Sequence, residues 1–365
     1  MMRLEDSGTS PKKNAAGEVA LVISGQGVCC PSGDVPSALL GAVATHISAA
    51  AADERFSLPI PGAEEGAAVL TAPVAQLQEL KDPPLRMAML AQTALEQALA
   101  ALADDFTWDE LLILTLVPDT RTPRGLPPHA LNQLRRDLSE LRPGLDRAAF
   151  RFASCEEGAV VHLQAACAEL REGKRRALLF GGVDSLVDLV TCTLLARDGR
   201  IATTHNSEGR VPGEGAAYVL LQPESAATAL AHLAGIGCAV EPNAGEADAK
   251  RMSGLSAAVT SSLEARSLSP AAMDCVIAPH DGSLSGALEW HHTVERLFPR
   301  REAAPRNFEE LLPCRSFGDL GAAALPLALV LGSARFEFSH SSVKHVMVCE
   351  TGDCPQRGAV LLVSF

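Results

Sequence analysis

The sequence predicts an α/β protein made of two similar halves, and three observations lead to this prediction. Short apolar runs that end near glycine recur along the 365 residues, with helix-like stretches between them. Strands that alternate with helices imply largely parallel sheets whose faces are covered. The runs form two series, each with a first buried strand, two further strands reached through helices, and a final strand. We therefore expect an architectural duplication, although the two series share no convincing similarity of sequence.

The expected strands of the first half are VALVISGQGV (19–28), ELLILTLVPD (110–119), ALLFGGVDS (177–185) and AAYVLLQ (216–222). Those of the second half are AHLAGIGCAV (231–240), MDCVIAPHDG (273–282), VKHVMVCETG (343–352) and GAVLLVSF (358–365). The halves should meet near residues 222–230, which gives an N-terminal half over 18–225 and a C-terminal half over 226–365. Residues 1–17 are charged and lack the apolar core of a secretory signal, so we expect a disordered tail there.

Three helices are expected to cover these strands. In the best defined, over 159–171, apolar side chains recur at helical spacing and should face the core: Val160, Leu163, Cys167 and Leu170. The other two helices are expected over 249–268 and 321–335. The segment RTPRGLPPHA (121–130) is rich in Pro, Gly and Arg, which predicts a loop.

The composition argues against two classes of partner. A formal net charge of −13 and an aromatic content of 4% disfavour nucleic-acid binding, which needs a basic footprint and stacking side chains. No apolar stretch reaches the roughly 20 residues needed to cross a bilayer. One basic run is a candidate site for an acidic carrier protein, although we prefer to interpret it as a solvated helix end: Arg171, Lys174, Arg175 and Arg176.

No pattern of metal or cofactor ligands is convincing. The ten cysteines form no CxxC pair, and their apolar surroundings indicate free core thiols in a reducing cytoplasm. His291 and His292 lie near Glu295 on an expected helix, and we interpret them as a solvated face. The GQG after the first strand is not a dinucleotide-binding motif. Three residues near the C-terminus also lack recognisable zinc-ligand spacing: His345, Cys349 and Cys354. We therefore expect no metal, no cofactor and a cytoplasmic protein.

Several segments, in order along the chain, resemble the β-ketoacyl synthases, a family with the thiolase fold. The best match is CAELREGKRRALLFGGVDSL (167–186), which resembles that family's helix, turn, strand and Gly-Gly segment. EGRVPGEGAAYVLLQ (208–222) resembles its glycine-rich hairpin, and VALVISGQGVCCPSG (19–33) resembles its first strand and loop. APHDGSLSGALEW (278–290) and SFGDLGAAALPLAL (316–329) resemble the segments that carry its two catalytic histidines. The resemblance implies two pseudo-duplicated βαβαβ halves in a five-layer α-β-α-β-α arrangement.

The resemblance also implies a nucleophile at the start of the helix over 159–171, and two adjacent residues compete for that position. The family loads acyl chains on a cysteine whose thiolate is favoured by the helix N-terminus, and its histidines stabilise the oxyanion formed when a malonyl unit loses CO2. Matching Cys167 and Gly173 to the family's helix without a gap places Glu156 at the nucleophile position and Cys155 one residue early. A one-residue insertion would restore Cys155, but it would turn the buried face of the helix by roughly 100°. We prefer Glu156.

Neighbouring residues favour the same interpretation. The carboxylates of Glu156 and Glu157 would oppose formation of a thiolate at Cys155. Residues 154–157 also have the Ser-x-x-Glu pattern of a capping box, which predicts that Ser154 caps this helix. We therefore interpret CEEG as a helix start rather than as a reactive thiol.

The other catalytic positions of the family are also changed. Only one of the two histidines is matched, by His280, for which catalytic and structural roles both stay open. Aligning the Gly-Ala-Ala at 321–323 with the family places Gly318 at the second histidine position and Pro313 at the position of a lysine. Asp319 is nearby, but its anion would repel a developing oxyanion. TGDCPQRGAV replaces the family's Gly-Phe-Gly-Gly gate.

The resemblance leads to two hypotheses about function. The first is a non-condensing subunit like the chain-length factors, which lack the nucleophile and pair with an active ketosynthase. Such subunits shape the cavity for the acyl chain in type II polyketide or fatty-acid biosynthesis, and an acyl carrier protein would be a further partner. Chain-length factors carry glutamine at the nucleophile position, so the charge of Glu156 is a departure. The second is an active acyl-thioester enzyme, a ketosynthase or malonyl decarboxylase, that uses Cys155 or Glu156 with His280. We expect the first, as a heterodimer rather than a scaffolding homodimer.

Overall fold

The computed structural model describes residues 19–58, 67–244, 252–298, 308–337 and 342–365. The tail predicted over 1–17 lies outside these residues. The first three positions of the helix predicted over 249–268 also lie outside them.

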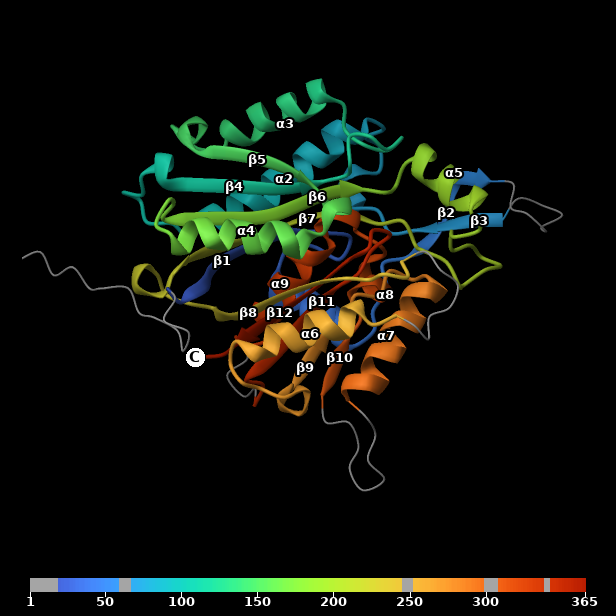
Figure 1. The fold of residues 1–365 in the computed structure, drawn as a ribbon. Helices are drawn as coiled ribbons and strands as arrows, with labels where there is room; N and C mark the ends of the chain where they lie inside the picture. The colour runs from blue at the N-terminus through green and yellow to red at the C-terminus, as the bar shows by residue number, and fades with distance from the viewer. Residues whose placement is uncertain (1–18, 59–66, 245–251, 299–307, 338–341) are drawn as a thin grey trace, which may run out of the picture.

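Two runs of strands and helices follow one another with the same order of elements (Figure 1). The first run contains β1 (Leu21–Cys29), α2 (Pro83–Leu99), β4 (Leu111–Val117), α3 (Pro128–Ser139), β5 (Ala149–Ser154), α4 (Ala159–Arg171), β6 (Ala177–Ser185) and β7 (Glu214–Pro223). The second contains β8 (Ala231–Val240), α6 (Gly254–Glu264), β9 (Cys275–Ile277), α7 (Leu284–Leu297), β10 (Glu309–Leu311), α9 (Ala324–Ala334), β11 (His345–Glu350) and β12 (Gln356–Val363). Further elements interrupt this plan: α1 (Pro36–Ala44), β2 (Ala51–Leu58), β3 (Ala67–Thr71), α5 (Leu189–Arg197) and α8 (Pro313–Phe317).

The order of the strands in the sheet repeats between the two runs. In the first run the order is β5-β4-β6-β7-β1, and in the second it is β10-β9-β11-β12-β8, which places corresponding strands at corresponding positions. In both orders the first two pairs of neighbours are parallel and the last two are antiparallel. The architectural duplication predicted from the sequence is therefore confirmed.

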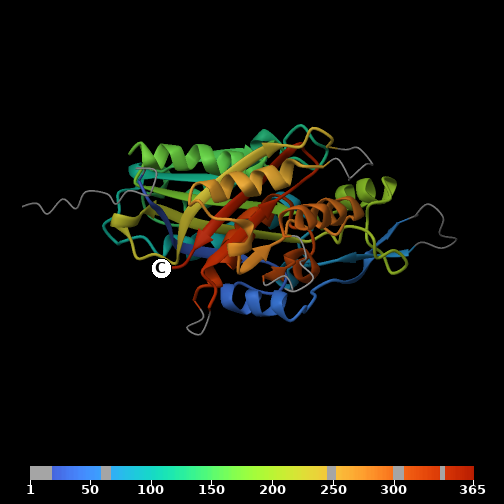
Figure 2. The same cartoon turned by 60° about the horizontal axis from the view of Figure 1, so that its bottom comes forward.

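The two runs are joined into one sheet of ten strands. The start of β1, Leu21–Ile23, pairs antiparallel with Ala231–Leu233 of β8. This pairing leaves β5 at one outer edge of the sheet and β10 at the other. The hairpin of β2 and β3 forms a separate sheet that extends from one side of the molecule (Figure 2).

Helices and strands alternate in five layers, as predicted (Figure 1). The outer helices α2 and α3 pack on the strands of the first run through one apolar cluster, and α6 and α7 pack on those of the second run through another. Between the two sets of strands lie α4 and α9, whose side chains share the largest cluster with strands of both runs. Every residue of α9 from Leu325 to Ala334 is buried, as expected for a helix that is apolar on all sides.

The predicted strands and helices are largely confirmed. Each of the eight predicted strand segments contains a strand, and α4 has the predicted bounds with its four predicted core residues buried. The helix predicted over 249–268 is shorter, because α6 covers Gly254–Glu264.

The prediction of four strands in each half was wrong, because each run has five within the residues that the structure describes. The missed strands are β5 and β10, which are the third strand of each run and the outer edges of the sheet. The sequence of β5, AFRFAS, is half-buried along most of its length, and β10 is only three residues long. Neither has the continuous apolar run that identifies a central strand.

A buried ion pair fixes α2 to the start of β7. The side chains of Arg86 and Glu214 are 3% and 0% exposed, and Nε of Arg86 donates to Oε2 of Glu214 at 2.9 Å. The backbone N–H of Val74 and the hydroxyl of Ser185 donate to the same carboxylate, each at 2.8 Å. These bonds satisfy a charge that would otherwise be costly to bury.

Candidate functional site

A cavity of about 410 Å³ lies where the parallel strands of both runs end. Its walls come from the segments that follow β4, β5, β6, β9, β10 and β11, together with the starts of α4 and α9. In α/β proteins, ligands bind outside the carboxyl ends of parallel strands, so the position is typical of a functional site.

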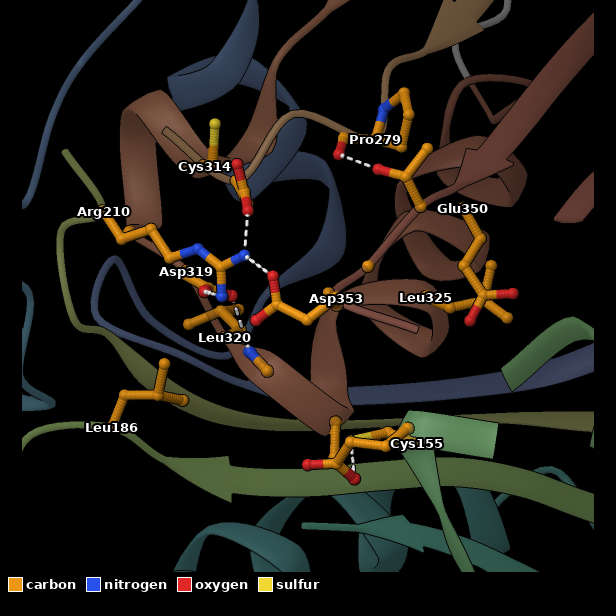
Figure 3. A pocket seen from close by; sticks show the side chains of 18 of the residues that line it. Cys155, Leu186, Arg210, Pro279, Cys314, Asp319, Leu320, Leu325, Glu350 and Asp353 are labelled. Carbon is orange, nitrogen blue, oxygen red and sulfur yellow. Dashed lines mark hydrogen bonds and ion pairs between the residues drawn. The ribbon is translucent and has the colours of Figure 1, made fainter. Parts of the chain in front are cut away.

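The cavity brings together all six site residues predicted from the sequence. Cys155 and Glu156 precede α4, and His280 follows β9. The other three precede α9: Pro313, Gly318 and Asp319. Figure 3 shows Cys155 and Leu186 on one side of the space, with Cys314 and Pro279 on the other. Apolar side chains also line it, including Leu320 and Leu325.

The thiol of Cys155 is held in its neutral form. Its Sγ donates to Oε2 of Glu156 at 3.2 Å, and this carboxylate oxygen also accepts from the backbone N–H of Asp119 at 2.8 Å. Burial raises the pKa of Cys155 well above its ordinary range, and the carboxylates of Asp184 and Glu156 add to that effect. A reactive thiolate needs the opposite surroundings.

The predicted capping box was wrong. The hydroxyl of Ser154 accepts from the backbone N–H of Glu156 at 3.2 Å, so it caps a separate 3-10 turn over Cys155–Glu157. Gly158 follows at φ +93°, a left-handed conformation that disfavours other residues, and a Cβ there would lie 2.7 Å from Cβ of Gln356. The turn and Gly158 separate the CEE segment from the helix, which begins at Ala159.

The start of α4 is capped from the other half of the chain. The carboxylate of Glu350, at the end of β11, accepts from the backbone N–H groups of Ala159 at 2.5 Å and Val160 at 2.8 Å. Burial raises the pKa of Glu350 to about 7, against the opposing effect of these two hydrogen bonds. Glu350 also lines the cavity, so it links the second half to the part of the site that carries Cys155.

His280 lies in the loop after β9 and is held by backbone. Its Nδ1 accepts from the N–H of Gly282 at 2.8 Å, and burial lowers the pKa of His280 despite the opposing charge of Asp281. Among the described residues no hydrogen bond joins His280 to Cys155 or Glu156. The geometry therefore gives His280 a structural partner, although its ring belongs to the cavity wall.

Around Gly318 and Asp319, a cluster of charges occupies the site. Gly318 follows α8 at φ +74°, and Pro313 is the first residue of α8. Arg210 pairs with Asp319 at 3.5 Å and Asp353 at 2.8 Å, and it also pairs with Asp281. Figure 3 shows the guanidinium of Arg210 between the carboxylates of Asp319 and Asp353.

This cluster is electrostatically coupled. Although burial opposes its charge, Asp319 and the two other carboxylates raise the pKa of Arg210. Burial raises the pKa of Asp319, whereas Arg210 holds the pKa values of Asp281 and Asp353 below their usual range against the effect of burial. An Arg210 guanidinium that already pairs with three carboxylates gives little assistance to a developing oxyanion.

A second arginine, Arg124, links Glu156 on the Cys155 side of the cavity to the buried Asp184. Nη2 of Arg124, in the loop after β4, lies 3.0 Å from Oδ2 of Asp184 and 3.9 Å from Oε1 of Glu156. Asp184 and other nearby acids raise the pKa of Arg124, while burial raises the pKa of Asp184. Gly321 approaches this carboxylate so closely that a Cβ would lie 2.0 Å from Oδ2. These contacts form a chain of charges from Asp184 through Arg124 to Glu156.

Sequence reasoning missed Arg124, Asp184 and Glu350 as members of the site. One signal was present for Asp184, because an acidic residue near the end of a continuous apolar strand has to find a buried partner. Glu350 similarly ends the apolar run of β11. Arg124 had no such signal, because the sequence RTPRGLPPHA does not show which of its arginines points inward. The loop predicted over 121–130 is shorter, since α3 begins at Pro128.

The candidate site for a carrier protein lies elsewhere. The basic run lies at the far end of α4, a helix of 13 residues and thus about 20 Å long. Two of its cations are paired, Lys174 with Glu172 at 2.5 Å and Arg176 with Glu110 at 3.0 Å, which favours a solvated helix end. In the parts of the chain that the structure describes, no cluster of three metal-ligating side chains is present, and no helix has the length and apolarity to span a bilayer.

Comparison with known proteins identifies the fold. No family model and no curated protein matches the sequence. A chain of the ishigamide ketosynthase/chain length factor matches with a TM-score of 0.74 at 16% identity, over 95% of this chain and 100% of that chain. A chain of AntDE:AntF, a type II PKS acyl-carrier protein in complex with its ketosynthase, matches with 0.74 at 13% identity, over 95% and 100%. A β-ketoacyl synthase from Burkholderia phymatum STM815 gives 0.72 at 16%, over 95% and 100%. The chain therefore has the thiolase-like fold of the ketosynthases, as predicted.

Proposed function

We propose that this chain is a non-condensing ketosynthase-like subunit of the chain-length-factor type. It pairs with an active ketosynthase in type II polyketide or fatty-acid biosynthesis and shapes the cavity for the growing acyl chain. The observation that carries the proposal is the buried Cys155–Glu156 hydrogen bond inside the cavity, in surroundings that keep the thiol of Cys155 protonated. The similarity to a ketosynthase/chain length factor supports the same class.

The second support is the loss of groups that would stabilise an oxyanion. Gly318 and Pro313 occupy the positions that the resemblance assigns to a histidine and a lysine. Asp319 and Arg210 fill the adjacent space with a closed ion pair. A malonyl unit that lost CO2 here would develop negative charge beside carboxylates, and this would raise the barrier to the reaction.

The edge strand β5 is the proposed surface for the ketosynthase partner. An edge strand presents unpaired backbone N–H and C=O groups, to which a strand of another chain can add. Phe150 and Phe152 are half-buried there, and Arg151 is exposed. Because β5 leads directly into Cys155, a partner on this edge would lie beside the cavity. The carrier protein is proposed as a further partner, by analogy with the AntF complex.

Co-purification tests the proposal. The tagged chain, expressed with the ketosynthase encoded nearest to it, should elute as a heterodimer. It should neither release CO2 from malonyl-carrier protein nor elongate an acyl chain when alone. Arg151→Asp on β5 should weaken the heterodimer, whereas Lys174→Asp, the same change of charge at the far end of α4, should not. A homodimer that condenses malonyl units without a partner would contradict the proposal.

The alternative is an active acyl-thioester enzyme that uses Cys155 or Glu156 with His280. One observation favours it, namely that all three residues line the same cavity. Acyl transfer from an acyl-carrier protein to the chain, followed by mass spectrometry of the peptide that contains Cys155, separates the two functions. A covalent acyl adduct that Cys155→Ala abolishes would establish the enzyme. Its absence, together with heterodimer formation, would support the non-condensing subunit.

A further inference from the structure

A second cavity, of about 480 Å³, lies where the two halves of the chain are joined. Its walls come from β1, the end of α2, Arg176 before β6, and the end of β7 with the segment that leads into β8. Directly before β7, the N–H of Gly213 donates to the carbonyl oxygen of Asp319, on the wall of the cavity described above. Gln222 lines the second cavity at the other end of this strand of ten residues, roughly 30 Å away. The two cavities are therefore separate.

A pair of polar side chains lines the second cavity. The register of β1 against β7 shifts between Ile23 and Gly25, and an irregularity of this kind changes the direction of the side chain between them, that of Ser24. The hydroxyl of Ser24 donates to Oε1 of Gln222 at 2.7 Å, whereas its contact with the carbonyl oxygen of Leu220 is longer, at 3.4 Å. Gln222 is only 7% exposed. The cavity wall therefore presents a hydroxyl and an amide side by side.

The hydrogen bond between Ser24 and Gln222 leaves one donor group and one acceptor atom for a ligand. Nε2 of Gln222 carries two hydrogens and has no hydrogen-bond partner among the residues that the structure describes. Because the hydroxyl hydrogen of Ser24 is directed at Gln222, its Oγ can only accept from a ligand. A ligand that satisfies both groups has to supply an acceptor and a donor close together. A carboxamide carries both on one carbon atom, whereas a carboxylate or a ketone supplies acceptors only.

The remaining walls favour a compact ligand without net charge. Apolar side chains that can pack on a ring line the cavity, among them Leu102 and Phe106. The charged residues of the described wall are Asp105 and Arg176, which have opposite signs, and Arg176 already pairs with Glu110 at 3.0 Å. A ligand anion would therefore have to compete with Glu110 for Arg176 and would approach the carboxylate of Asp105.

We propose that the second cavity binds a small neutral carboxamide. The carbonyl oxygen of the ligand accepts from Nε2 of Gln222, its N–H donates to Oγ of Ser24, and its apolar part packs on Leu102 and Phe106. Binding makes and breaks no covalent bond. The site is independent of the proposed function, because its residues lie at the junction of the two halves and not in the cavity that contains Cys155.

Three probes of nearly the same shape test this selection on the purified full-length chain. Benzamide supplies an acceptor and a donor, whereas acetophenone and benzoate supply acceptors only. Titration followed by NMR of the probe should give the tightest binding for benzamide. Acetophenone should bind at least about threefold more weakly because one hydrogen bond is lost, and benzoate at least as weakly as acetophenone because its charge must also be desolvated. Equal binding of the three probes, binding of none, or tightest binding of acetophenone or benzoate would overturn the proposal.

Two variants test whether the probes bind in the second cavity. Gln222→Leu removes the amide and should abolish the preference for benzamide over acetophenone. Ala227→Trp fills the cavity from the segment between β7 and β8 and should abolish binding of all three probes. The matched control is Gln164→Leu on the exposed side of α4, which should bind benzamide as tightly as the natural chain.

The variants also keep the proposal falsifiable. A folded Gln222→Leu variant that retains the preference for benzamide would overturn it. Should that variant not fold, Ala227→Trp decides, because unchanged binding of benzamide by this variant would place the probe elsewhere on the molecule and would equally overturn the proposal.

Discussion

The thiol of Cys155 donates a hydrogen bond to the carboxylate of Glu156, with 3.2 Å between Sγ and Oε2. The side chains of these two adjacent residues thus contact one another directly after β5, and each affects the ionisation or the hydrogen bonding of the other. The carboxylate disfavours the thiolate, and the thiol occupies an acceptor position of the carboxylate. The two side chains that the sequence offered for one position are therefore paired with one another.

Cys155 should react slowly with iodoacetamide. Burial is the main cause of its raised pKa, and the charges of Asp184 and Glu156 add to it. Removing one of those charges with Glu156→Gln should speed alkylation by at most about tenfold, which corresponds to one pKa unit. Mass spectrometry of the Cys155 peptide over time at about pH 8 measures the rate.

The exposed reference for this measurement is a short peptide that contains CEEG. Labelling of the folded chain at the rate of that peptide would show that the thiol is not protected. A Glu156→Gln rate equal to that of the natural chain would show that Glu156 does not contribute to the protection.

The stability of the chain should depend on the ionisation of Glu350. Its pKa is about 7 in the folded chain and starts from 4.5, so the folded state binds more protons than the unfolded state between these values. This group therefore stabilises the fold as the pH falls from about 8 to about 5, by at most about 3 kcal/mol. Glu350→Gln keeps an acceptor for the α4 N-terminus but removes the titration.

Urea denaturation at about pH 5.5 and about pH 8 measures this effect. The titration of Glu350 adds to the free energy of unfolding of the natural chain at about pH 5.5 relative to about pH 8. Glu350→Gln should lose this added stability at the lower pH. Glu172→Gln, at the exposed far end of α4, serves as the control and should leave the difference unchanged. A pH dependence identical in Glu350→Gln and the natural chain would refute the prediction.

Arg86→Met should destabilise the chain by about 3–5 kcal/mol, because it leaves the buried carboxylate of Glu214 without its countercharge. The double variant Arg86→Met with Glu214→Gln should recover a large part of that loss, since it removes the uncompensated charge. Chemical denaturation of the two single variants and the double variant measures the coupling. Arg197→Met, in an exposed ion pair with Asp198, should leave the stability nearly unchanged. Additive effects of Arg86 and Glu214 would be inconsistent with this account.

Arg210→Met should make the chain sensitive to rising pH. Without Arg210, the carboxylates of Asp281, Asp319 and Asp353 would lose a shared countercharge, so their pKa values in the folded state would rise. A folded-state pKa above the unfolded value gives a fold that becomes less stable as the pH increases through that range. The melting temperature of Arg210→Met should therefore fall further below that of the natural chain at about pH 8 than at about pH 5. If the melting temperature of Arg210→Met were lower than that of the natural chain by the same amount at both pH values, lost packing would explain the change instead.

The sequence was sufficient to predict the interior of the fold but not its edges. Strands such as β6 and helices such as α9 are recognisable because apolar runs or helical spacing mark elements with buried faces. The edge strand β5 mixes Arg151 with two phenylalanines, and β10 consists of EEL, so neither has a buried pattern. These two strands were missed for the same physical reason, namely exposure of one side.

The site was predictable to the extent that it is encoded locally. Cys155, Glu156, His280 and Asp319 lie in segments with a recognisable position in the fold, and they do converge on one cavity. Contacts between distant segments were not predictable. The Ser-x-x-Glu pattern correctly indicated that Ser154 caps a turn, but that turn is the 3-10 turn over Cys155–Glu157 and not the helix. The helix itself is capped by Glu350, which lies 191 residues further along the chain than Ala159.

The backbone hydrogen bonds between β1 and β8 have a consequence for how the cavity behaves. Because they make the strands of both halves continuous, the halves cannot swing apart like hinged domains without breaking sheet pairing. Entry must therefore depend on small movements of surface loops, while the enclosing framework keeps a constant shape. Any ligand of the cavity would therefore meet walls of fixed dimensions.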